Sequence, residues 1–525
     1  MRKNLTLLIM LALFPLNVLL AENPGPVYLF SYFVGEADGL HLAWSEDGYH
    51  WEPLAGNASL LTPQVGEDKL MRDPSICQGP DGTFHMVWTS SWHDRIIGYA
   101  SSRDLVHWSE QKAIPVMMHE PDAGNCWAPE LFYDAPSETY YIYWATTIPG
   151  RHSYVSTTDN EKGLNHRIYC TTTKDFETFS PTEMFFNPDF SVIDAAIVRD
   201  AAANELIMFV KNENSSPAEK NIRITRTDDI RKGFPTDVSA PIHGKYWAEG
   251  PAPLFLADGS LIVYFDRYID GKYGAAVSRD NGKSWTDVPD EDLSFPEGMR
   301  HGTAFKVSAK QFRTIQMNLA IPQRHSVRQY KDMPLSAEHI AFLQGEIKKC
   351  NGQGGLSFSL VTGEPEAFKG IGHFSNALNY IVLAAKDAPD AARRVGYYGE
   401  QLVLMAQANG LNTCWVAGSY NKVDRTMSVP EGYHLYGVIS IGYGKDSGKV
   451  RTSKSFDAVT EGRDFPEWFV AGVEAALLAP TAMNRQTFTF SWDGKKVKAS
   501  APGQDYEQLS LGIAEYHFDI ASGRK

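Results

Sequence analysis

The chain has 525 residues, 43% of them hydrophobic and 12% aromatic, and a formal net charge of -14 at pH 7. This length exceeds one ordinary hydrophobic core, so we expect at least two domains. The negative charge argues against nucleic acid or anionic lipid as the main partner, because both require a basic protein surface.

The N-terminus has the pattern of a signal peptide. Arg2 and Lys3 precede an apolar run over residues 5–20, and Ala21 offers a small residue at a cleavage site. We therefore predict a signal peptide over residues 1–21 and export to a periplasm or to the medium. No later stretch of the sequence is long and apolar enough to span a bilayer.

Cysteines are few and widely spaced. The five are Cys77, Cys126, Cys170, Cys350 and Cys414, and they form no Cys-x-x-Cys pair. This spacing indicates neither a zinc site nor a disulfide framework, so we expect buried free thiols.

A repeated unit runs through the first three hundred residues: two β-rich runs, then Ser or Thr, an aspartate and an aromatic residue. The repeat aspartates are Asp47, Asp104, Asp175, a weaker copy at Asp228, and Asp280, separated by 57, 71, 53 and 52 residues. We expect Asp47, Asp104, Asp175 and Asp280 to form turns. Units of about 50 residues are typical of β-propeller blades, so the sequence predicts an all-β five-bladed β-propeller over residues 25–308.

The first copy starts too close to the N-terminus to contain four strands. We expect residues 301–307 to supply its missing innermost strand and so to close the ring.

Four acidic residues stand at similar places in successive units. Asp73, Glu130, Asp194 and Glu249 precede their unit's aspartate by 31, 45, 34 and 31 residues, which predicts an innermost strand and a carboxyl group facing the central axis. Asp-Pro and Glu-Gly-Pro are also common turn sequences, so each acid taken alone has a structural alternative. Their shared position favours a site, in which Asp73, Asp194 and Glu249 are the candidate acid–base groups of a sugar-cleaving enzyme.

Five ordered motifs carry a family resemblance: Arg72-Asp73-Pro74, Trp127-Ala-Pro-Glu130, Val192-Ile-Asp194, Ala248-Glu249-Gly-Pro251 and Arg300-His301-Gly302. In this order they resemble glycoside hydrolase family 43. The resemblance implies a five-bladed propeller and inverting hydrolysis, with Asp73 as general base, Asp194 as the group that tunes and orients the acid, and Glu249 as proton donor. It also implies substrates with α-L-arabinofuranosyl or β-D-xylosyl groups from plant polysaccharides.

Other site residues follow from the same resemblance. His301 matches an axial histidine that contacts a central water or a calcium ion, although a core histidine is the alternative. Glu130 stands where many relatives carry aspartate and is expected to line the pocket. Trp127 and Trp247, with Trp92, are candidates for stacking on sugar rings, and core packing is an equal alternative for each.

The sequence changes character after Ser308. Helical patterns appear over residues 336–349, with Ser336 as N-cap, and over residues 399–410, ended by Gly410. Strand-like runs at residues 380–384 and 436–442 alternate with them. We therefore predict a second, α+β domain over residues 320–525.

This second domain resembles the flavin-dependent nitroreductase family. The resemblance rests on Arg324-His-Ser326-Val-Arg328, on residues 410–415 and on the segment containing Asn484 and Gln486. It implies that FMN binds, with Arg324, Ser326 and Arg328 on the phosphate and Asn484 and Gln486 at the flavin ring. The alternative is that these residues are helix caps and surface charges.

The leading hypothesis is an exported, inverting glycosidase with an appended nitroreductase-like domain. One alternative is a propeller that binds carbohydrate without cleaving it. Another is an FMN-dependent oxidoreductase whose propeller serves as a carbohydrate-binding module. The sequence leaves the exact sugar and the oligomeric state open.

Overall fold

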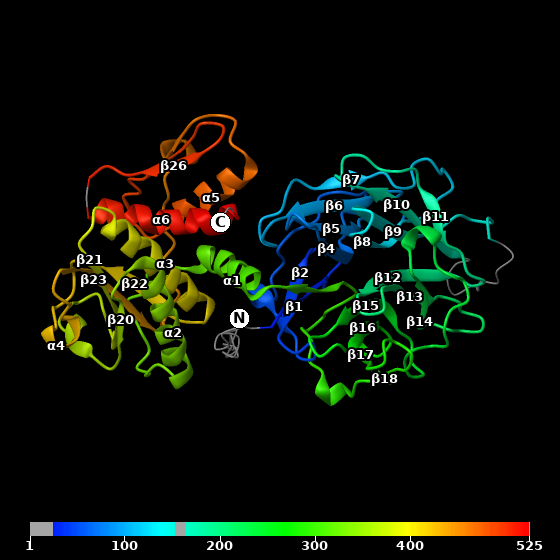
Figure 1. The fold of residues 1–525 in the computed structure, drawn as a ribbon, viewed down its shortest axis with the longest axis horizontal. Helices are drawn as coiled ribbons and strands as arrows, with labels where there is room; N and C mark the ends of the chain where they lie inside the picture. The colour runs from blue at the N-terminus through cyan, green and yellow to red at the C-terminus, as the bar shows by residue number, and fades with distance from the viewer. Residues whose placement is uncertain (1–24, 153–163, 504, 524–525) are drawn as a thin grey trace, which may run out of the picture. The chain divides into compact units, whose positions relative to one another are not determined.

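The computed structural model describes residues 25–152, 164–503 and 505–523 (Figure 1). The predicted signal peptide at residues 1–21 lies outside the described residues. The described chain divides into two compact units, residues 25–312 and residues 313–523, and the division falls inside helix α1 (Ala309–Gln323). Each unit is described by itself below.

The first unit consists of antiparallel sheets. Its strands are β1 (Val27–Tyr32), β2 (His41–Ser45), β3 (Glu52–Pro53), β4 (Arg72–Gln78), β5 (Phe84–Thr89), β6 (Ile97–Ser102), β7 (Lys112–Ile114), β8 (Trp127–Asp134), β9 (Thr139–Thr147), β10 (His166–Thr173), β11 (Glu183–Phe186), β12 (Val192–Asp200), β13 (Glu205–Asn212), β14 (Asn221–Thr227), β15 (Glu249–Phe255), β16 (Leu261–Arg267), β17 (Lys272–Ser278), β18 (Thr286–Asp287) and β19 (Ala304–Val307). Within the described ranges they form the sheets β19-β1-β2-β3, β4-β5-β6-β7, β8-β9-β10-β11, β12-β13-β14 and β15-β16-β17-β18.

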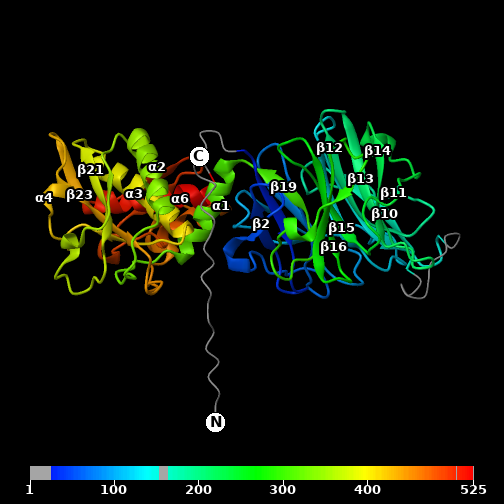
Figure 2. The same ribbon diagram turned by 90° about the horizontal axis from the view of Figure 1, so that it is seen from below.

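The first sheet takes one strand from the far end of the unit. Strand β19 pairs antiparallel with β1, so that Val27 lies opposite Val307 and Phe30 opposite Ala304. Figure 2 shows β19 near the first sheet, although about 270 residues of sequence separate the two strands. This pairing is the one expected for residues 301–307.

The repeat aspartates form turns, as predicted. Oδ1 of Asp104 accepts hydrogen bonds from the backbone N–H groups of Val106 and His107, at 3.0 and 2.8 Å. Asp47, Asp175 and Asp280 bind the turns that follow them in the same way. The carboxylates therefore satisfy backbone donors that would otherwise be unpaired.

Aromatic side chains fill the space between the first and the last of these sheets. Phe30 packs edge-on against Trp51, Tyr264 and Tyr273, with ring centroids 5.2 to 5.7 Å apart. Such edge-to-face pairs add to the free energy of burying the rings. The five cysteines all lie in described residues and are free thiols, four of them buried.

The second unit combines helices with two small sheets. Its helices are the end of α1, α2 (Ala337–Gly354), α3 (Ala391–Ala408), α4 (Asp424–Met427), α5 (Glu467–Leu477) and α6 (Tyr506–Ser522), and its strands are β20 (Ser359–Val361), β21 (Asn379–Lys386), β22 (Asn412–Val416), β23 (Tyr433–Gly442), β24 (Thr460–Glu461), β25 (Thr489–Trp492) and β26 (Val497–Ser500). The sheet β20-β21-β23-β22 is antiparallel, and β24 joins β25 in parallel. This is the α+β composition that the sequence predicted.

The start of α2 agrees with the sequence, but α2 continues five residues beyond the predicted residue 349, and α3 starts earlier than predicted. Ser336 caps α2 by accepting a hydrogen bond from the backbone N–H of His339, as expected. Helix α3 begins eight residues earlier than the predicted residue 399. The early turns contain Gly396, which usually weakens a helix. A Cβ there would lie 2.0 Å from the carbonyl oxygen of Leu509, so glycine is needed where α3 packs against α6. In the part of the chain that the structure describes, no helix has the length and apolar character of a membrane span.

Candidate functional site

The four predicted acids lie on strands that share an irregularity. Strands β4, β8, β12 and β15 are each first in their sheet, and each shows a register shift in its pairing at its start. At each shift one residue has a positive φ: Asp73 (53°), Ala128 (46°), Asp194 (54°) and Gly250 (60°). A left-handed conformation is costly for residues other than glycine and is found where function requires a particular geometry.

These bulges show that the acids are not strictly equivalent. Asp73 and Asp194 occupy the bulge position itself, Glu249 precedes it by one residue, and Glu130 follows it by two. Asp73, Glu130, Asp194 and Glu249 are nevertheless close, since the charges of Glu249 and Asp73 raise the pKa of Asp194 and that of Asp73 raises the pKa of Glu130. We refer to these four residues as the carboxylate cluster.

Asp73 is a buried carboxylate with two side-chain partners. Its Oδ2 accepts a hydrogen bond from the Thr89 hydroxyl at 2.8 Å, and its Oδ1 lies 3.2 Å from Nδ1 of His301. Burial alone would raise the pKa of Asp73, but the charge and hydrogen bond of His301, with Arg72 and Thr89, lower it to about 2. Asp73 is therefore ionised at any moderate pH. Thr89 also accepts the backbone N–H of Ala128, which ties two neighbouring bulges together.

His301 carries the positive charge at the centre of the cluster. Burial lowers its pKa, but the carboxylates of Asp73, Asp194 and Glu130 outweigh this effect and raise it to about 9. Gly250 leaves the space for this ring, since a Cβ there would lie 2.4 Å from it.

The structure gives no support for a calcium ion at His301. Calcium takes six to eight oxygen ligands, and the described residues contain no group of three or more His, Cys, Asp or Glu side chains that could hold a metal ion. The imidazolium already supplies the positive charge that the neighbouring carboxylates require.

Asp194 differs from Asp73 although both occupy bulges. Its Oδ2 accepts the backbone N–H of Gly250 at 3.0 Å. Burial raises the pKa of Asp194 to about 6, with the charges of Glu249 and Asp73 adding to burial and those of His301 and Lys211 opposing it. Two carboxyl groups in the same backbone position thus have pKa values pushed far apart, which is the pattern of acid–base sites.

Glu249 is the most accessible member, with about 20% of its side chain exposed. Its Oε2 lies 3.0 Å from Nζ of Lys211 and its Oε1 lies 3.3 Å from Nη2 of Arg300. Each oxygen therefore faces a different cation.

Glu130 lies two residues further along its strand than the bulge and is almost fully buried. It accepts hydrogen bonds from the hydroxyls of Ser75 at 2.5 Å and Thr303 at 3.1 Å. Burial raises its pKa to about 7. These contacts link β8 to β4 and to the segment before β19, so Glu130 connects three sheets beneath the more accessible Glu249.

The predicted tryptophans divide into two kinds. Trp247 is 39% exposed, and its ring lies 6.1 Å from that of Tyr268. Trp127 is instead anchored, because its Nε1 donates to the carbonyl oxygen of Trp92 at 3.0 Å and its ring meets the Trp92 ring edge-on. Trp247, beside Glu249 in the chain, is thus the more accessible surface for a sugar ring.

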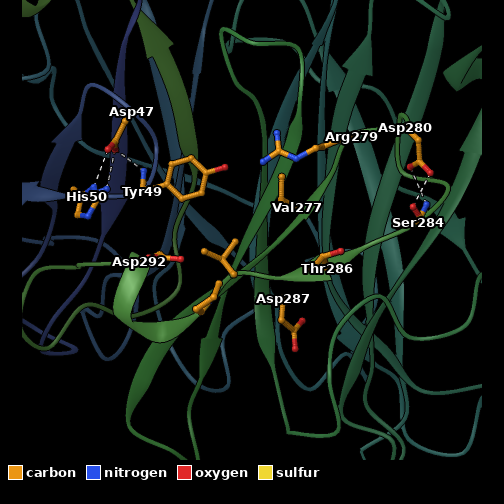
Figure 3. Close-up of a pocket in the computed structure, with 12 residues that line it drawn as sticks. Asp47, Tyr49, His50, Val277, Arg279, Asp280, Ser284, Thr286, Asp287 and Asp292 are labelled. Atoms are coloured by element: carbon orange, nitrogen blue, oxygen red, sulfur yellow. Dashed lines mark hydrogen bonds and ion pairs between the residues drawn. The ribbon is translucent and has the colours of Figure 1, made fainter.

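A cavity of about 670 Å³ lies elsewhere in the first unit (Figure 3). It is lined by the turn at Asp47–His50 and the hairpin that joins β17 to β18. Strand β16 lies between this cavity and the carboxylate cluster. At one end of β16, Asp266 pairs with Glu249 of the cluster. At its other end, Leu261 pairs with Ser278 of β17, next to the cavity. Asp47 and Asp280 bind their own turns here, so we assign the chemistry to the carboxylate cluster and not to this cavity.

The second unit contains a cavity of about 540 Å³. Ser326, Arg328 and Asn484 line it, as does Arg451, which the sequence analysis did not single out. Nη2 of Arg451 donates to Oγ of Ser326 at 2.7 Å. Partial burial and then the charge of Arg328 lower the pKa of Arg451, so the two guanidinium groups lie close to one another. Two neighbouring arginines beside a hydroxyl form a site suited to a phosphate group.

Two of the predicted flavin residues do not line this cavity. Arg324 is buried, donates to the carbonyl oxygen of Leu478 at 3.0 Å and lies 3.8 Å from Glu400. Gln486 is buried and binds the backbone at Lys454 and Leu477. Met483, Asn484 and Gln486 all have positive φ, so the backbone around this wall of the cavity is strained.

Sequence reasoning also missed Lys211 and Thr89. Lys211 directly follows the apolar run Leu206–Val210. A lysine at the end of a buried strand needs a charged partner, so its position could have indicated a nearby acid. Thr89 carried no comparable signal, since hydroxyl residues are common at strand ends.

Comparisons with known proteins follow the same division of the chain. Residues 23–313 match the family model described as "Probable glycosyl hydrolase domain", and residues 316–522 match the one described as "Putative TM nitroreductase". Both resemblances found in the sequence are thereby confirmed. No curated protein matches the chain in sequence.

Solved structures resemble parts of the chain. An endo-arabinase from Bacteroides thetaiotaomicron is 17% identical over 44% of this chain and 84% of its own, with a TM-score of 0.34. An α-L-arabinofuranosidase from Lactobacillus brevis is 16% identical over 42% and 72%, with a TM-score of 0.31. A nitroreductase-type protein from Thermotoga maritima is 24% identical over 39% and 82%, with a TM-score of 0.31. Because these TM-scores are low, the family assignment rests on the two family-model matches.

Proposed function

We propose that this chain, which belongs to the family of probable glycosyl hydrolase domains, is an inverting glycoside hydrolase. We place its substrates among glycans that carry α-L-arabinofuranosyl or β-D-xylosyl groups, as plant polysaccharides do. We also take the five sheets of the first unit as blades of a closed propeller around the carboxylate cluster. The observation that carries the proposal is the gathering of three carboxyl groups at the bulges of β4, β12 and β15. Asp73 is held there by His301 and Thr89, and Asp194 binds the backbone N–H next to the more exposed Glu249.

Asp73 is assigned as the general base. Its pKa of about 2 keeps it ionised, so it can accept a proton from a water molecule that attacks the anomeric carbon. Such a low pKa also makes it a weak base, so placing the water correctly matters more than basicity. The hydrogen bonds from His301 and Thr89 leave further lone pairs on the carboxylate oxygens for this water.

Glu249 is assigned as the general acid. It gives its proton to the glycosidic oxygen as the bond to the anomeric carbon breaks, while the water on the opposite face forms the new bond. Asp194 binds the backbone N–H of Gly250, directly after Glu249, and so orients the acid. Trp247 precedes Glu249 by two residues and is placed to contact the leaving sugar.

Export belongs to the proposal as well. A signal peptide at residues 1–21 would bring the enzyme to a periplasm or to the medium, where polysaccharide is present. Detection of the mature protein outside the cytoplasm, with its new N-terminus after Ala21, would support this part.

The test is hydrolysis of nitrophenyl α-L-arabinofuranoside and nitrophenyl β-D-xyloside by the full chain, beside its Glu249→Ala variant. We expect release from one substrate by the wild type, together with cleavage of matching oligosaccharides that the variant cannot perform. No cleavage of either substrate or of arabinose- and xylose-containing oligosaccharides would contradict the proposal. Retained binding of those oligosaccharides would then favour a carbohydrate-binding propeller.

The 540 Å³ cavity favours a second function, FMN binding by the C-terminal domain. Arg328, Arg451 and Ser326 would hold the phosphate, and the cavity walls include Trp415 and Asn484. Bound FMN would supply redox chemistry at this site. The visible absorbance of flavin in the purified chain, or its appearance on adding FMN, tests this directly, and a protein that stays colourless with excess FMN removed by gel filtration would contradict it.

A further inference from the structure

Lys211 is a buried lysine in the first unit that the mechanism above does not use. It lies near the end of β13 and pairs in register with Ile193, next to the bulge at Asp194. Only 3% of its side chain is exposed. Lysine is almost never buried to this degree unless it is paired, because removing its charge from water is costly.

Its ammonium group has three partners in the structure. Nζ lies 3.0 Å from Oε2 of Glu249 and 2.6 Å from Oε2 of Glu213. It also lies 4.9 Å from the ring centroid of Tyr268, within the range of a cation–π contact. The carboxylates of Glu213 and Glu249, with that of Asp194, hold the pKa of Lys211 well above its usual range despite burial. Lys211 is therefore charged near neutral pH.

A second buried lysine binds the same glutamate as Lys211. Glu213 uses its other oxygen to contact Nζ of Lys220 at 2.6 Å, and Lys220 is as buried as Lys211. The side chains Lys220, Glu213, Lys211 and Glu249 thus form a chain of alternating charges that ends at the accessible acid. Glu213 therefore contacts both buried lysines at once, and each of its carboxylate oxygens faces a different one.

The other groups that face Glu249 come from three more segments. Arg300, before β19, lies 3.3 Å from Oε1 and also pairs with Asp266 of β16. Asp194 of β12 acts on the cluster through its charge and through Gly250. His301 acts on Asp73, Asp194 and Glu130. Among these groups Lys211 is the one that binds Oε2, the oxygen that Arg300 does not reach.

We propose that Lys211 is a positioning residue for Glu249: it fixes the orientation of Oε2 and stabilises the negative charge that forms when Glu249 gives up its proton. This inference rests on the proposed glycosidase function. During the reaction the proton passes from the carboxyl of Glu249 to the glycosidic oxygen, the leaving sugar departs with it, and the carboxylate that remains faces Lys211 and Arg300. A cation that is already in place and shielded from water stabilises this charge without rearrangement.

The position of Lys211 predicts a dependence on the leaving group. A sugar alcohol is a poor leaving group and needs full proton transfer, so its departure benefits from a stabilised Glu249 carboxylate. A nitrophenolate needs little protonation and should be insensitive.

The experiment compares Lys211→Met with Lys220→Met in the full chain. Both remove a buried lysine that binds Glu213, but only Lys211 contacts Glu249. For Lys211→Met we expect kcat/KM on an oligosaccharide to fall about 100-fold, as when one charge-stabilising donor is removed from an active site. We expect a fall of less than about tenfold on the nitrophenyl glycoside. For Lys220→Met we expect a lower thermal midpoint without this difference between the two substrates.

If Lys211→Met does not fold, Lys211→Arg takes its place. Arginine keeps the charge but not the compact ammonium, so kcat/KM on oligosaccharides should fall more than kcat/KM on the nitrophenyl glycoside. The inference is overturned if Lys211→Met and Lys220→Met lose activity equally on both substrates, or if Lys211→Arg retains full activity on oligosaccharides. An inactive wild type would instead contradict the proposed function, and this inference would fall with it.

Discussion

Nδ1 of His301 lies 3.2 Å from Oδ1 of Asp73, and both side chains are buried. The pair lowers the pKa of the aspartate to about 2 and raises that of the histidine to about 9. A carboxylate kept ionised in this way remains ready to accept a proton at any moderate pH.

Replacement of His301 by glutamine should destabilise the first unit by about 3–5 kcal/mol near neutral pH, because buried Asp73 loses its cation. The pKa of Asp73 falls from 3.8 and that of His301 rises from 6.5, so the pair contributes fully between about pH 4 and pH 6.5. The contribution is lost as pH falls through about 2 or rises through about 9. Thermal midpoints of wild type and variant from pH 4 to pH 10 test this, and an equally large difference at both ends would contradict it.

Asp73→Ala should inactivate the enzyme toward every substrate, including nitrophenyl glycosides, with a loss of at least about 100-fold. An activated leaving group removes the need for an acid but not the need to activate water. The measurement is kcat/KM on one nitrophenyl glycoside and one oligosaccharide. Asp104→Asn, at a repeat turn, is the matched control for a lost carboxylate outside the site. Asp73→Ala with appreciable activity on the nitrophenyl substrate would remove Asp73 from the role of base.

Asp194→Asn should slow catalysis and at the same time stabilise the protein above about pH 6. Burial raises the pKa of Asp194 from 3.8 to about 6, so ionising it costs more in the folded than in the unfolded state. Stability is therefore lost as pH rises between these values, and asparagine removes that loss while still accepting the Gly250 N–H. Midpoints at pH 4 and pH 7.5 are the measurement. A variant that is less stable than wild type at the higher pH would contradict the prediction.

Arg451→Gln should weaken FMN binding by about 10- to 100-fold, because it removes one charged hydrogen bond to the phosphate, whose free energy corresponds to this change in affinity. Riboflavin, which lacks the phosphate, should bind wild type and variant alike. Quenching of flavin fluorescence gives both affinities. Arg463→Gln is the control, since Arg463 is 94% exposed and contacts only its neighbour Asp464 at 3.9 Å among the ion pairs of the described residues. An equal loss for both flavins would mean that Arg451 does not hold the phosphate.

Much of the first unit could be predicted because its sequence repeats. Each turn aspartate follows two strands, and its hydrogen bonds go to the residues directly after it. Each copy can therefore be recognised from its own short stretch of sequence. Chain order alone was also enough to expect that residues near 301–307 would join the first sheet. Asp73, Asp194 and Glu249 could be singled out because acids at the start of apolar strands are rare.

The remaining features depend on contacts between distant residues. The bulges shift Glu130 and Glu249 away from the backbone position of Asp73, and no periodicity in the sequence marks a single inserted residue. Arg451 reaches Ser326 across 125 positions of sequence. The sequence could not favour Arg451 over Arg324 as the phosphate ligand. Arg324 has the same side chain and lies in the stronger motif, but in the structure it is buried against Glu400.

The bulge of β8 limits how the carboxylate cluster can be altered. Ala128 has the same left-handed backbone as Asp73 and Asp194, but it is buried and contributes only a methyl group. Its backbone N–H binds Thr89, whose hydroxyl donates to Asp73, so a change of backbone at residue 128 reaches Asp73 through Thr89. A side chain at Gly250 is excluded, because its Cβ would lie 2.4 Å from the ring of His301. Substitutions meant to reshape this region should therefore leave residues 128 and 250 unchanged.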